Sequence, residues 1–227
     1  NIDDEITRKH ITKLSMHNVI KTYGLQHKSD YSIDFRKELP DLADFNAYNY
    51  LAAYAVCREL GLPDGDIRSA FSTFKLPAGR IDIVYRQNFM VIVDFAHTPN
   101  GITRILETVR KQYVHRKGQL IHVFGSAGLR DHTKRFAMGK ASATFADISY
   151  VTEEDYRTED PQKIADEIGA GFGRKHYLVE LNREKAIHTA IQSAKKDDVV
   201  IITGKGHEKS LCRGKIEYPW DEIQTVK

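Results

Sequence analysis

From residue 80 onward, short apolar runs alternate with longer stretches in which apolar residues recur every three or four positions. The short runs predict strands buried on both faces of a sheet, and the recurring pattern predicts amphipathic helices. The expected strands are residues 81–85, 89–93, 120–124, 148–151, 177–181 and 199–202, and the expected helices are at about residues 99–115, 132–145, 161–171 and 183–194. This order indicates an α/β fold with a mostly parallel sheet covered by helices on both faces.

Capping residues mark the starts of several of these helices. The Thr-Pro pair at 98–99 and the Asp-Pro pair at 160–161 place a side-chain acceptor before a proline, which suits the first helical position. Asn182 and Asp131 are expected to cap the helices that follow them. These starts predict that the polar residues before them lie in loops between a strand and a helix.

The first 78 residues carry a different pattern. Residues 1–40 are polar with short alternating stretches, which predict one or two edge strands and loops. Helices are expected at about 45–60 and 64–74, where apolar residues return at helical spacing. The Pro-Ala-Gly-Arg sequence at 77–80 interrupts this pattern and indicates a domain boundary. The expected domains are residues 1–78 and 79–227.

Composition and charge exclude several classes of protein. The 227 residues are 41% hydrophobic and 29% charged, which is ordinary for a globular protein. The net charge of +3 is small and the basic residues are scattered, so nucleic acid is not the expected partner. No apolar run approaches the roughly 20 residues that a membrane span needs. The two cysteines lack metal-ligand spacing, so we expect a cytoplasmic protein with no metal ligands of its own.

Four polar clusters follow expected strands, at residues 94–100, 125–135, 152–160 and 203–208. In a parallel sheet, all four lie along the carboxyl edge, where open α/β sheets bind their ligands. A solvated rim of loops is the alternative interpretation. The mixture of charged residues and glycine in these clusters favours a binding site.

Each cluster suggests a different chemistry. The glycine-containing loop at 125–135 leads into a helix, whose backbone amides can hold an anion, and Arg130 can bind a carboxylate or phosphate with two nitrogens. Residues 153–160 place five acids around one arginine, which suits a cationic amine, or else a charged surface loop. The Gly-Lys-Gly-His-Glu sequence at 204–208 superficially resembles a phosphate loop, but no Ser or Thr follows its lysine. A Walker loop is absent from the sequence.

Asp94 places a carboxylate between an apolar strand and a helix start. Such a position is typical of nucleotide sites in open α/β sheets, because a helix N-terminus at the carboxyl end of a strand attracts phosphate. The alternative is that Asp94 only caps a turn.

Taken together, these clusters resemble the Mur ligase family, in particular the branch that adds an amino acid to UDP-N-acetylmuramoyl-dipeptide. Six motifs agree in order and rough spacing along about residues 45–210. They are Phe-Asn-Ala-Tyr-Asn at 45–49, Gly-Arg at 79–80, Val-Asp-Phe-Ala-His-Thr-Pro at 93–99, the 124–135 loop, Thr-Glu-Asp-Pro at 158–161 and Gly-Lys-Gly-His-Glu at 204–208.

The resemblance implies an ATP-dependent ligase of peptidoglycan precursor synthesis. Residues 1–78 would be the C-terminal part of the central ATP-binding domain, and residues 79–227 the Rossmann-like C-terminal domain. Such an enzyme uses ATP and Mg²⁺ to convert the carboxylate of UDP-MurNAc-dipeptide into an acyl phosphate, which a free amino acid then attacks. Since the chain starts at Asn1 without Met or a P-loop, we expect a fragment of a longer protein. The fragment would be monomeric and inactive alone, with the Mg²⁺ ligands outside it.

The resemblance also implies roles for residues near the nucleotide. Asn46 and Asn49 match asparagines that face the adenine of ATP. Arg80 matches the hinge arginine that reaches the phosphates. Asp94 matches the aspartate near the ribose hydroxyls, and His97 lies beside it.

For the incoming amino acid, the matching positions are Arg130, Gly204, Glu208 and the motif at 154–157. The family's Asp-Asn-Pro-Arg motif here is Glu154, Asp155, Tyr156 and Arg157. Two arginines suit a substrate with two carboxylates, such as diaminopimelate, whereas the added acid favours lysine. We expect a diamino acid and leave its identity open.

Two other hypotheses remain at this point. One is a different amide ligase of the same superfamily, of the cyanophycin or folylpolyglutamate type. The other is a nucleotide- or metabolite-binding module that does not catalyse a reaction. A P-loop in the sequence before Asn1 would favour a ligase.

Overall fold

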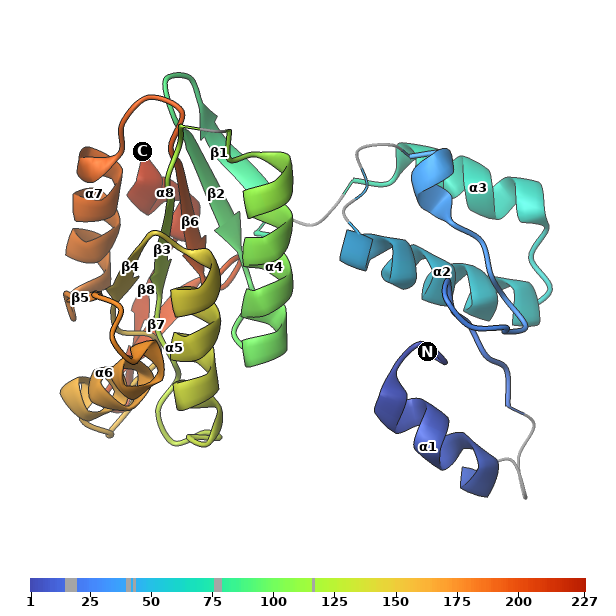
Figure 1. Cartoon of the computed structure of the whole chain (residues 1–227), viewed down its shortest axis with the longest axis horizontal. Helices are drawn as coiled ribbons and strands as arrows, with labels where there is room; N and C mark the ends of the chain where they lie inside the picture. The colour runs from blue at the N-terminus through green and yellow to red at the C-terminus, as the bar shows by residue number, and fades with distance from the viewer. Residues whose placement is uncertain (15–19, 40–41, 43, 76–78, 116) are drawn as a thin grey trace. The chain divides into compact units, whose positions relative to one another are not determined.

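The computed structural model describes residues 1–14, 20–39, 42, 44–75, 79–115 and 117–227. The chain forms two compact units, Asn1–Lys75 and Leu76–Lys227 (Figure 1). Of the break expected at 77–80, residues 77 and 78 lie outside the described residues, and Gly79 adopts a left-handed backbone with φ +73°. Among the described residues, no helix is both long and apolar enough to cross a membrane.

The second unit is built on a six-stranded sheet in the order β1-β2-β6-β3-β4-β5. Only the pairing of β1 with β2 is antiparallel, and the other neighbours pair in parallel. The strands are β1 Asp82–Arg86, β2 Met90–Asp94, β3 Leu120–Phe124, β4 Ile148–Val151, β5 Leu178–Val179 and β6 Val199–Thr203. The expected mostly parallel α/β sheet is confirmed.

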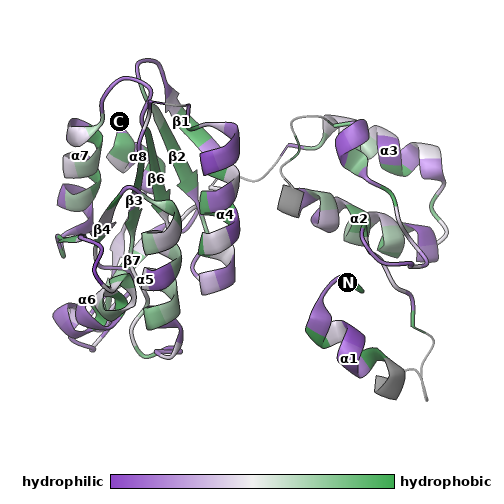
Figure 2. Ribbon diagram, in the orientation of Figure 1, coloured by the Kyte–Doolittle hydropathy of each residue, from purple (hydrophilic) through white to green (hydrophobic). Residues whose placement is uncertain are grey.

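Helices cover both faces of this sheet. The helices are α4 Pro99–Gln112, α5 Lys134–Phe145, α6 Pro161–Gly169, α7 Arg183–Ser193 and α8 Glu222–Val226. Alternate strand residues such as Val91, Val123 and Val200 pack with Ala186 and Ile187 of α7. Figure 2 shows hydrophobic strands between helices that carry hydrophilic surfaces.

Side-chain caps begin three of these helices as expected. Thr98 accepts a hydrogen bond from the Gly101 N–H, Asp160 from that of Gln162, and Asn182 from that of Lys185. The cap expected at Asp131 is wrong. The Asp131 carboxylate accepts from the N–H and hydroxyl of Thr133, so it closes a turn before α5 begins.

A β-hairpin and a short helix follow β6, where no element was expected. Its strands are β7 Ser210–Arg213 and β8 Ile216–Pro219, which pair antiparallel. The turn contains Gly214 in a left-handed conformation, φ +64°, which glycine adopts without steric cost. The segment was missed because its strands are short and β8 is exposed, so neither shows a clear apolar pattern.

The first unit is helical around a small aromatic core. Its elements are α1 Glu5–Leu14, the short 3₁₀ helix η1 Phe35–Lys37, α2 Asp44–Glu59 and α3 Asp64–Thr73. Over residues 1–14 and 20–39, the part of this segment that the structure describes, the expected edge strands are wrong. The Asp4 carboxylate accepts from the Thr7 N–H at 2.7 Å and so begins a helix, and an isolated bridge joins Tyr23 and Tyr31. Phe35 is fully buried in the core.

Candidate ligand site at the carboxyl edge of the sheet

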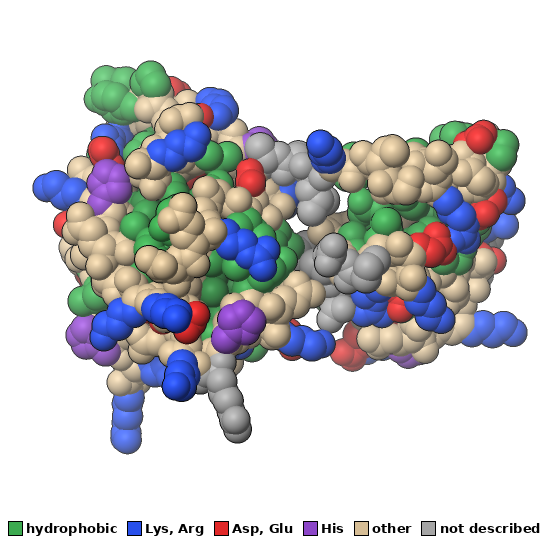
Figure 3. Space-filling view, turned by 90° about the horizontal axis from the view of Figure 1, so that it is seen from above, with side chains coloured by type: hydrophobic (Ala, Val, Ile, Leu, Met, Phe, Trp, Pro, Cys, Tyr) green, Lys and Arg blue, Asp and Glu red, His purple; other side chains and the backbone are tan. Residues whose placement is uncertain are grey.

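The four polar clusters converge as the sequence predicts. They follow the carboxyl ends of β2, β6, β3 and β4, which are consecutive neighbours in the sheet. Asp94 and Thr203 pair across β2 and β6, so the first and last clusters start at the same level. Figure 3 is seen from above in the view of Figure 1, the side opposite to this edge, and shows Lys, Arg and acidic side chains exposed there as well.

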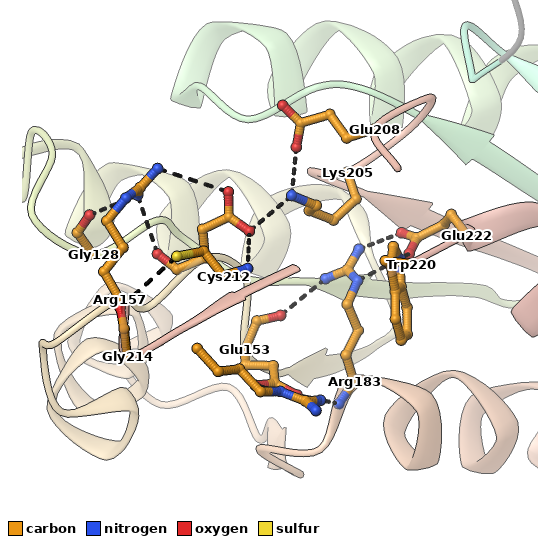
Figure 4. A network of polar contacts seen from close by, with 12 residues as sticks. Gly128, Glu153, Arg157, Arg183, Lys205, Glu208, Cys212, Gly214, Trp220 and Glu222 are labelled. Atoms are coloured by element: carbon orange, nitrogen blue, oxygen red, sulfur yellow. Dashed lines mark hydrogen bonds and ion pairs between the residues drawn. The ribbon is translucent and has the colours of Figure 1, made fainter. Parts of the chain in front are cut away.

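Arg157 occupies a constrained position in the loop that follows β4 (Figure 4). Its backbone is left-handed, φ +52°, a region that non-glycine residues seldom adopt. The guanidinium donates to the carbonyl oxygens of Gly128 at 3.0 Å and Asp155 at 3.3 Å. The side chain thereby bridges the loops that follow β3 and β4.

Asp155 and Glu208 both bind the ammonium of Lys205. The distances from Lys205 Nζ are 2.8 Å to Asp155 Oδ1 and 2.5 Å to Glu208 Oε2. Lys205 is buried, which opposes its charge, but the two carboxylates outweigh burial and raise its pKa. The Glu208 side chain remains 40% exposed and can still accept a ligand. Sequence reasoning missed Lys205, although it lies within the 204–208 motif.

The acids of the 152–160 loop differ in their surroundings. Glu153 pairs with Arg213 of β7 at 2.5 Å, a structural contact. Glu154 is buried, and its Oε2 has no hydrogen-bond partner within the described part of the chain. Burial raises the pKa of the Glu154 carboxyl, against the opposing effect of the nearby Arg183 charge. Glu154 is therefore enclosed, whereas Glu208 faces solvent.

Arg130 precedes the 152–160 loop in the sequence, and Gly204 follows it. Arg130 is exposed and forms no ion pair with any described residue, which leaves its guanidinium available for an anion. It follows Leu129, whose left-handed backbone, φ +54°, is held by an amide hydrogen bond to Glu159 Oε2 at 3.0 Å. Gly204 has φ +114° and lies against the Glu154 carboxylate.

Asp94 binds the backbone around it. Oδ2 accepts from the Ile81 N–H at 2.9 Å and Oδ1 from the Ala96 N–H at 2.8 Å, so Asp94 does cap a turn. Burial raises the pKa of the Asp94 carboxyl, an effect that these two hydrogen bonds and the charge of Arg80 oppose. Each oxygen retains acceptor capacity for a hydroxyl group.

The ring of Phe95, the residue after Asp94, contacts one arginine and two histidines. The Arg80 guanidinium lies over its ring at 4.8 Å from the centroid, and the His97 and His207 rings lie at 4.7 and 5.0 Å. Gly79 packs so closely on Gly206 that a Cβ would lie 2.5 Å from that backbone. This contact joins the start of the unit to the 204–208 loop and places Arg80 beside His207. Phe95 and His207 were not predicted as site residues.

Asn46 and Asn49 lie one turn apart on α2 in the other unit. The Asn49 amide donates to Asn46 Oδ1 at 3.1 Å. Asn46 is buried and Asn49 is exposed, so only Asn49 presents its amide to solvent. Within the described residues, no three or more His, Cys, Asp and Glu side chains are grouped so that they could hold a metal ion.

Comparisons with known proteins agree with the motifs. The family model "Mur ligase, glutamate ligase domain" matches residues 79–206. A UDP-N-acetylmuramoyl-L-alanyl-D-glutamate--2,6-diaminopimelate ligase of Aquifex aeolicus is 37% identical, over 99% of this chain and 49% of its own length. The enzyme of the same name from Clostridium botulinum is 36% identical, over 100% of this chain and 50% of its own length. The chain thus spans about half the length of the curated relatives it matches.

Solved structures support the same fold. A 2,6-diaminopimelate ligase of that name aligns with a TM-score of 0.63 and 27% identity, over 100% of this chain and 51% of its own. A folylpolyglutamate synthase of Mycobacterium tuberculosis aligns with a TM-score of 0.58 and 23% identity, over 78% of this chain and 39% of its own. At 23% identity, the second structure is evidence of a similar fold only.

Proposed function

The chain belongs to the Mur ligase family, and on that premise we propose that it carries the amino-acid-binding half of an ATP-dependent ligase. In this proposal the complete enzyme joins diaminopimelate to UDP-MurNAc-dipeptide in the cytoplasm, during peptidoglycan precursor synthesis. The observation that carries the proposal is the convergence of four charged loops at one sheet edge, within the residues that match the family. Residues 1–78 would belong to the central ATP-binding domain and residues 79–227 to the C-terminal domain.

The charges at this edge suit a zwitterionic amino acid. Arg130 and Arg157 would bind carboxylates, and Glu208 with the Gly204 backbone would bind an ammonium group. Holding both ends of the substrate orients the amine toward the acyl phosphate. Attack of the amine nitrogen on the acyl carbon forms the amide bond, releases phosphate and gives up a proton.

The contacts of Asp155 favour diaminopimelate over lysine as the substrate. The argument for lysine rested on an additional acid, Asp155, available to a basic side chain. Asp155 Oδ1 instead accepts from Lys205 at 2.8 Å and from the Cys212 N–H at 2.9 Å. Its charge is balanced within the chain by Lys205 and by Arg157, whose Nη2 lies 3.8 Å from Asp155 Oδ2. Arg157 and the exposed Arg130 would bind the two carboxylates. The names of the relatives point in the same direction.

The nucleotide roles belong to the same proposal. Asn46 and Asn49 would face adenine, Arg80 the phosphates, and Asp94 with His97 the ribose. The Asp94 oxygens retain acceptor capacity, and Arg80 and Asn49 are exposed, so these three side chains fit their roles, whereas the buried Asn46 would act through its hydrogen bond with Asn49. Glu154 and Asp155, which were expected to contact the amino acid, would instead support the residues that bind it. Magnesium would be bound by residues outside this chain, and the enzyme would be monomeric.

The test is phosphate release by the natural polypeptide that carries this chain, supplied with ATP, UDP-MurNAc-L-Ala-D-Glu and single amino acids. We expect release that depends on the amino acid and is fastest with diaminopimelate. Release that requires glutamate and a folate would favour the folylpolyglutamate-type ligase. ATP binding without release under any of these conditions would favour the non-catalytic module.

A further inference from the structure

Strand β7 lies directly against the loop that carries Arg157. The Arg157 N–H donates to the Cys212 carbonyl at 3.2 Å, and the Gly214 N–H donates to the Arg157 carbonyl at 2.7 Å. A parallel bridge between Arg157 and Arg213 results. The hairpin lies beyond residue 206, the last residue of the family match. It therefore contacts the proposed amino-acid site from outside the matched segment.

The left-handed backbone of Arg157 needs such support. A non-glycine residue at φ +52° is strained, and such strain persists only where the surroundings hold it. Here both backbone polar groups of Arg157 are bound by β7 and its turn, and the guanidinium is bound by the carbonyls of Gly128 and Asp155. The conformation of Arg157 is thus fixed at its backbone by the hairpin and at its guanidinium by the loops that follow β3 and β4.

Asp155 is the residue that joins the hairpin to these loops. Its Oδ1 accepts from the Cys212 N–H of β7 and from Lys205 of the loop after β6. Its backbone oxygen accepts from the Gly128 N–H, at 2.8 Å, in the loop after β3. One residue thereby connects β7 with the loops that follow β3, β4 and β6.

An ion pair anchors the same hairpin at the adjacent position. Arg213 donates to both carboxylate oxygens of Glu153, at 2.5 and 2.9 Å, and Glu153 is buried. A two-point contact of this kind fixes direction as well as distance. The hairpin is therefore held to the segment after β4 at Cys212, by Asp155, and at Arg213, by Glu153.

We infer that Asp155 is a positioning residue, which acts with the Arg213–Glu153 pair to hold Arg157 in the conformation that binds the substrate carboxylate. The substrate named in this inference rests on the proposed function, whereas the way in which the Arg157 conformation is held does not. Asp155 then supplies a hydrogen-bond acceptor to the chain, and the substrate ammonium is left to Glu208.

Two substitutions of Asp155 separate positioning from direct contact. Asparagine keeps an oxygen acceptor for Lys205 and Cys212 but has no charge, whereas alanine removes both. In the natural polypeptide that carries this chain, Asp155→Ala should raise the amino-acid KM about tenfold or more, with the ATP KM unchanged, and Asp155→Asn should stay within about threefold. Equal effects of the two substitutions on the amino-acid KM would show that a hydrogen-bond acceptor at this position does not position Arg157, and would overturn the inference.

The hairpin anchor has a matched control. Arg213→Met removes the pair with Glu153, and Lys209→Met removes the pair with Asp221 at the exposed base of the same hairpin. Amide hydrogen exchange of Arg157, measured on the chain itself, should accelerate at least about tenfold in Arg213→Met and Asp155→Ala. It should remain at the wild-type rate in Lys209→Met.

The exchange experiment is independent of the substrate. If the wild-type enzyme uses no amino acid, the proposed function fails while the exchange of Arg157 still decides the positioning role. Unchanged exchange at Arg157 in both Arg213→Met and Asp155→Ala would overturn the inference even if diaminopimelate is the substrate.

Discussion

The ion pair of Arg183 with Glu222 offers a quantitative test of how the carboxyl edge is supported. Both side chains are fully buried, and Arg183 also donates to the carbonyls of Thr203 at 2.8 Å and Glu153 at 3.2 Å. Arg183 thereby ties together the ends of β6 and β4, from which two of the site loops start. Replacing Arg183 with Met would leave the Glu222 carboxylate buried, with the Trp220 Nε1–H, 2.7 Å away, as its remaining donor.

We expect Arg183→Met to lower the free energy of unfolding by about 3–5 kcal/mol, because removing one partner of a buried pair leaves an uncompensated charge. The double variant Arg183→Met/Glu222→Gln should recover at least about 1–2 kcal/mol of this loss, since the stranded charge is gone. Lys209→Met, which breaks an ion pair whose lysine is 72% exposed, should cost no more than about 1 kcal/mol.

The assay is urea denaturation followed by fluorescence. Trp220 is the single tryptophan of the chain and donates to Glu222, so its emission reports unfolding of the second unit at the pair itself. A loss in Arg183→Met no larger than that in Lys209→Met would refute the reasoning. So would additive losses from the two single substitutions, Arg183→Met and Glu222→Gln, because they would show that the pair is not energetically coupled.

Three further predictions concern substrate, acid stability and nucleotide. In the complete enzyme, Arg157→Lys should raise the amino-acid KM more than the ATP KM, because lysine lacks the planar two-point donor; steady-state kinetics check this, and an unchanged amino-acid KM would contradict it. Hydrogen bonds from Arg135 hold the pKa of Glu159 at about 2, below its ordinary 4.5, so this contribution to stability is complete above about pH 4.5 and is lost as pH falls toward 2. Glu159→Gln should flatten the acid limb of stability against pH, and an identical acid limb in the variant would count against it. Asp94→Ala and Asn49→Ala should each weaken ATP binding by about 1–3 kcal/mol in calorimetry of the complete enzyme, and unchanged affinity would remove that residue from the nucleotide site.

The sheet and its helices could be predicted because their signals are local. The buried strands are mostly apolar runs, and Thr98, Asp160 and Asn182 begin helices with side-chain caps that are visible in the sequence. The convergence of the polar loops then follows from parallel pairing alone. The prediction of secondary structure failed where two local signals compete. In α1, the cap at Asp4 prevails over the alternation that suggested a strand.

The partners within the site could not be predicted in the same way. Sequence spacing does not show that Asp155 meets Cys212, 57 positions along the chain, or that Lys205 lies buried between two carboxylates. A charge that looks available in the sequence can be balanced by such a distant contact. That is why Asp155 suggested lysine as substrate until the structure showed its partners. Glu208, whose side chain is 40% exposed, keeps the role that its motif suggested.

The proposed diaminopimelate specificity is tested most directly by competition. The complete enzyme would be supplied with ATP, UDP-MurNAc-L-Ala-D-Glu and equal concentrations of diaminopimelate and lysine, and the nucleotide products would be identified by mass spectrometry. The account predicts that the product carrying diaminopimelate predominates, because Arg130 and Arg157 can each bind one of its carboxylates. Predominance of the lysine product, or no product that contains either amino acid, would contradict it.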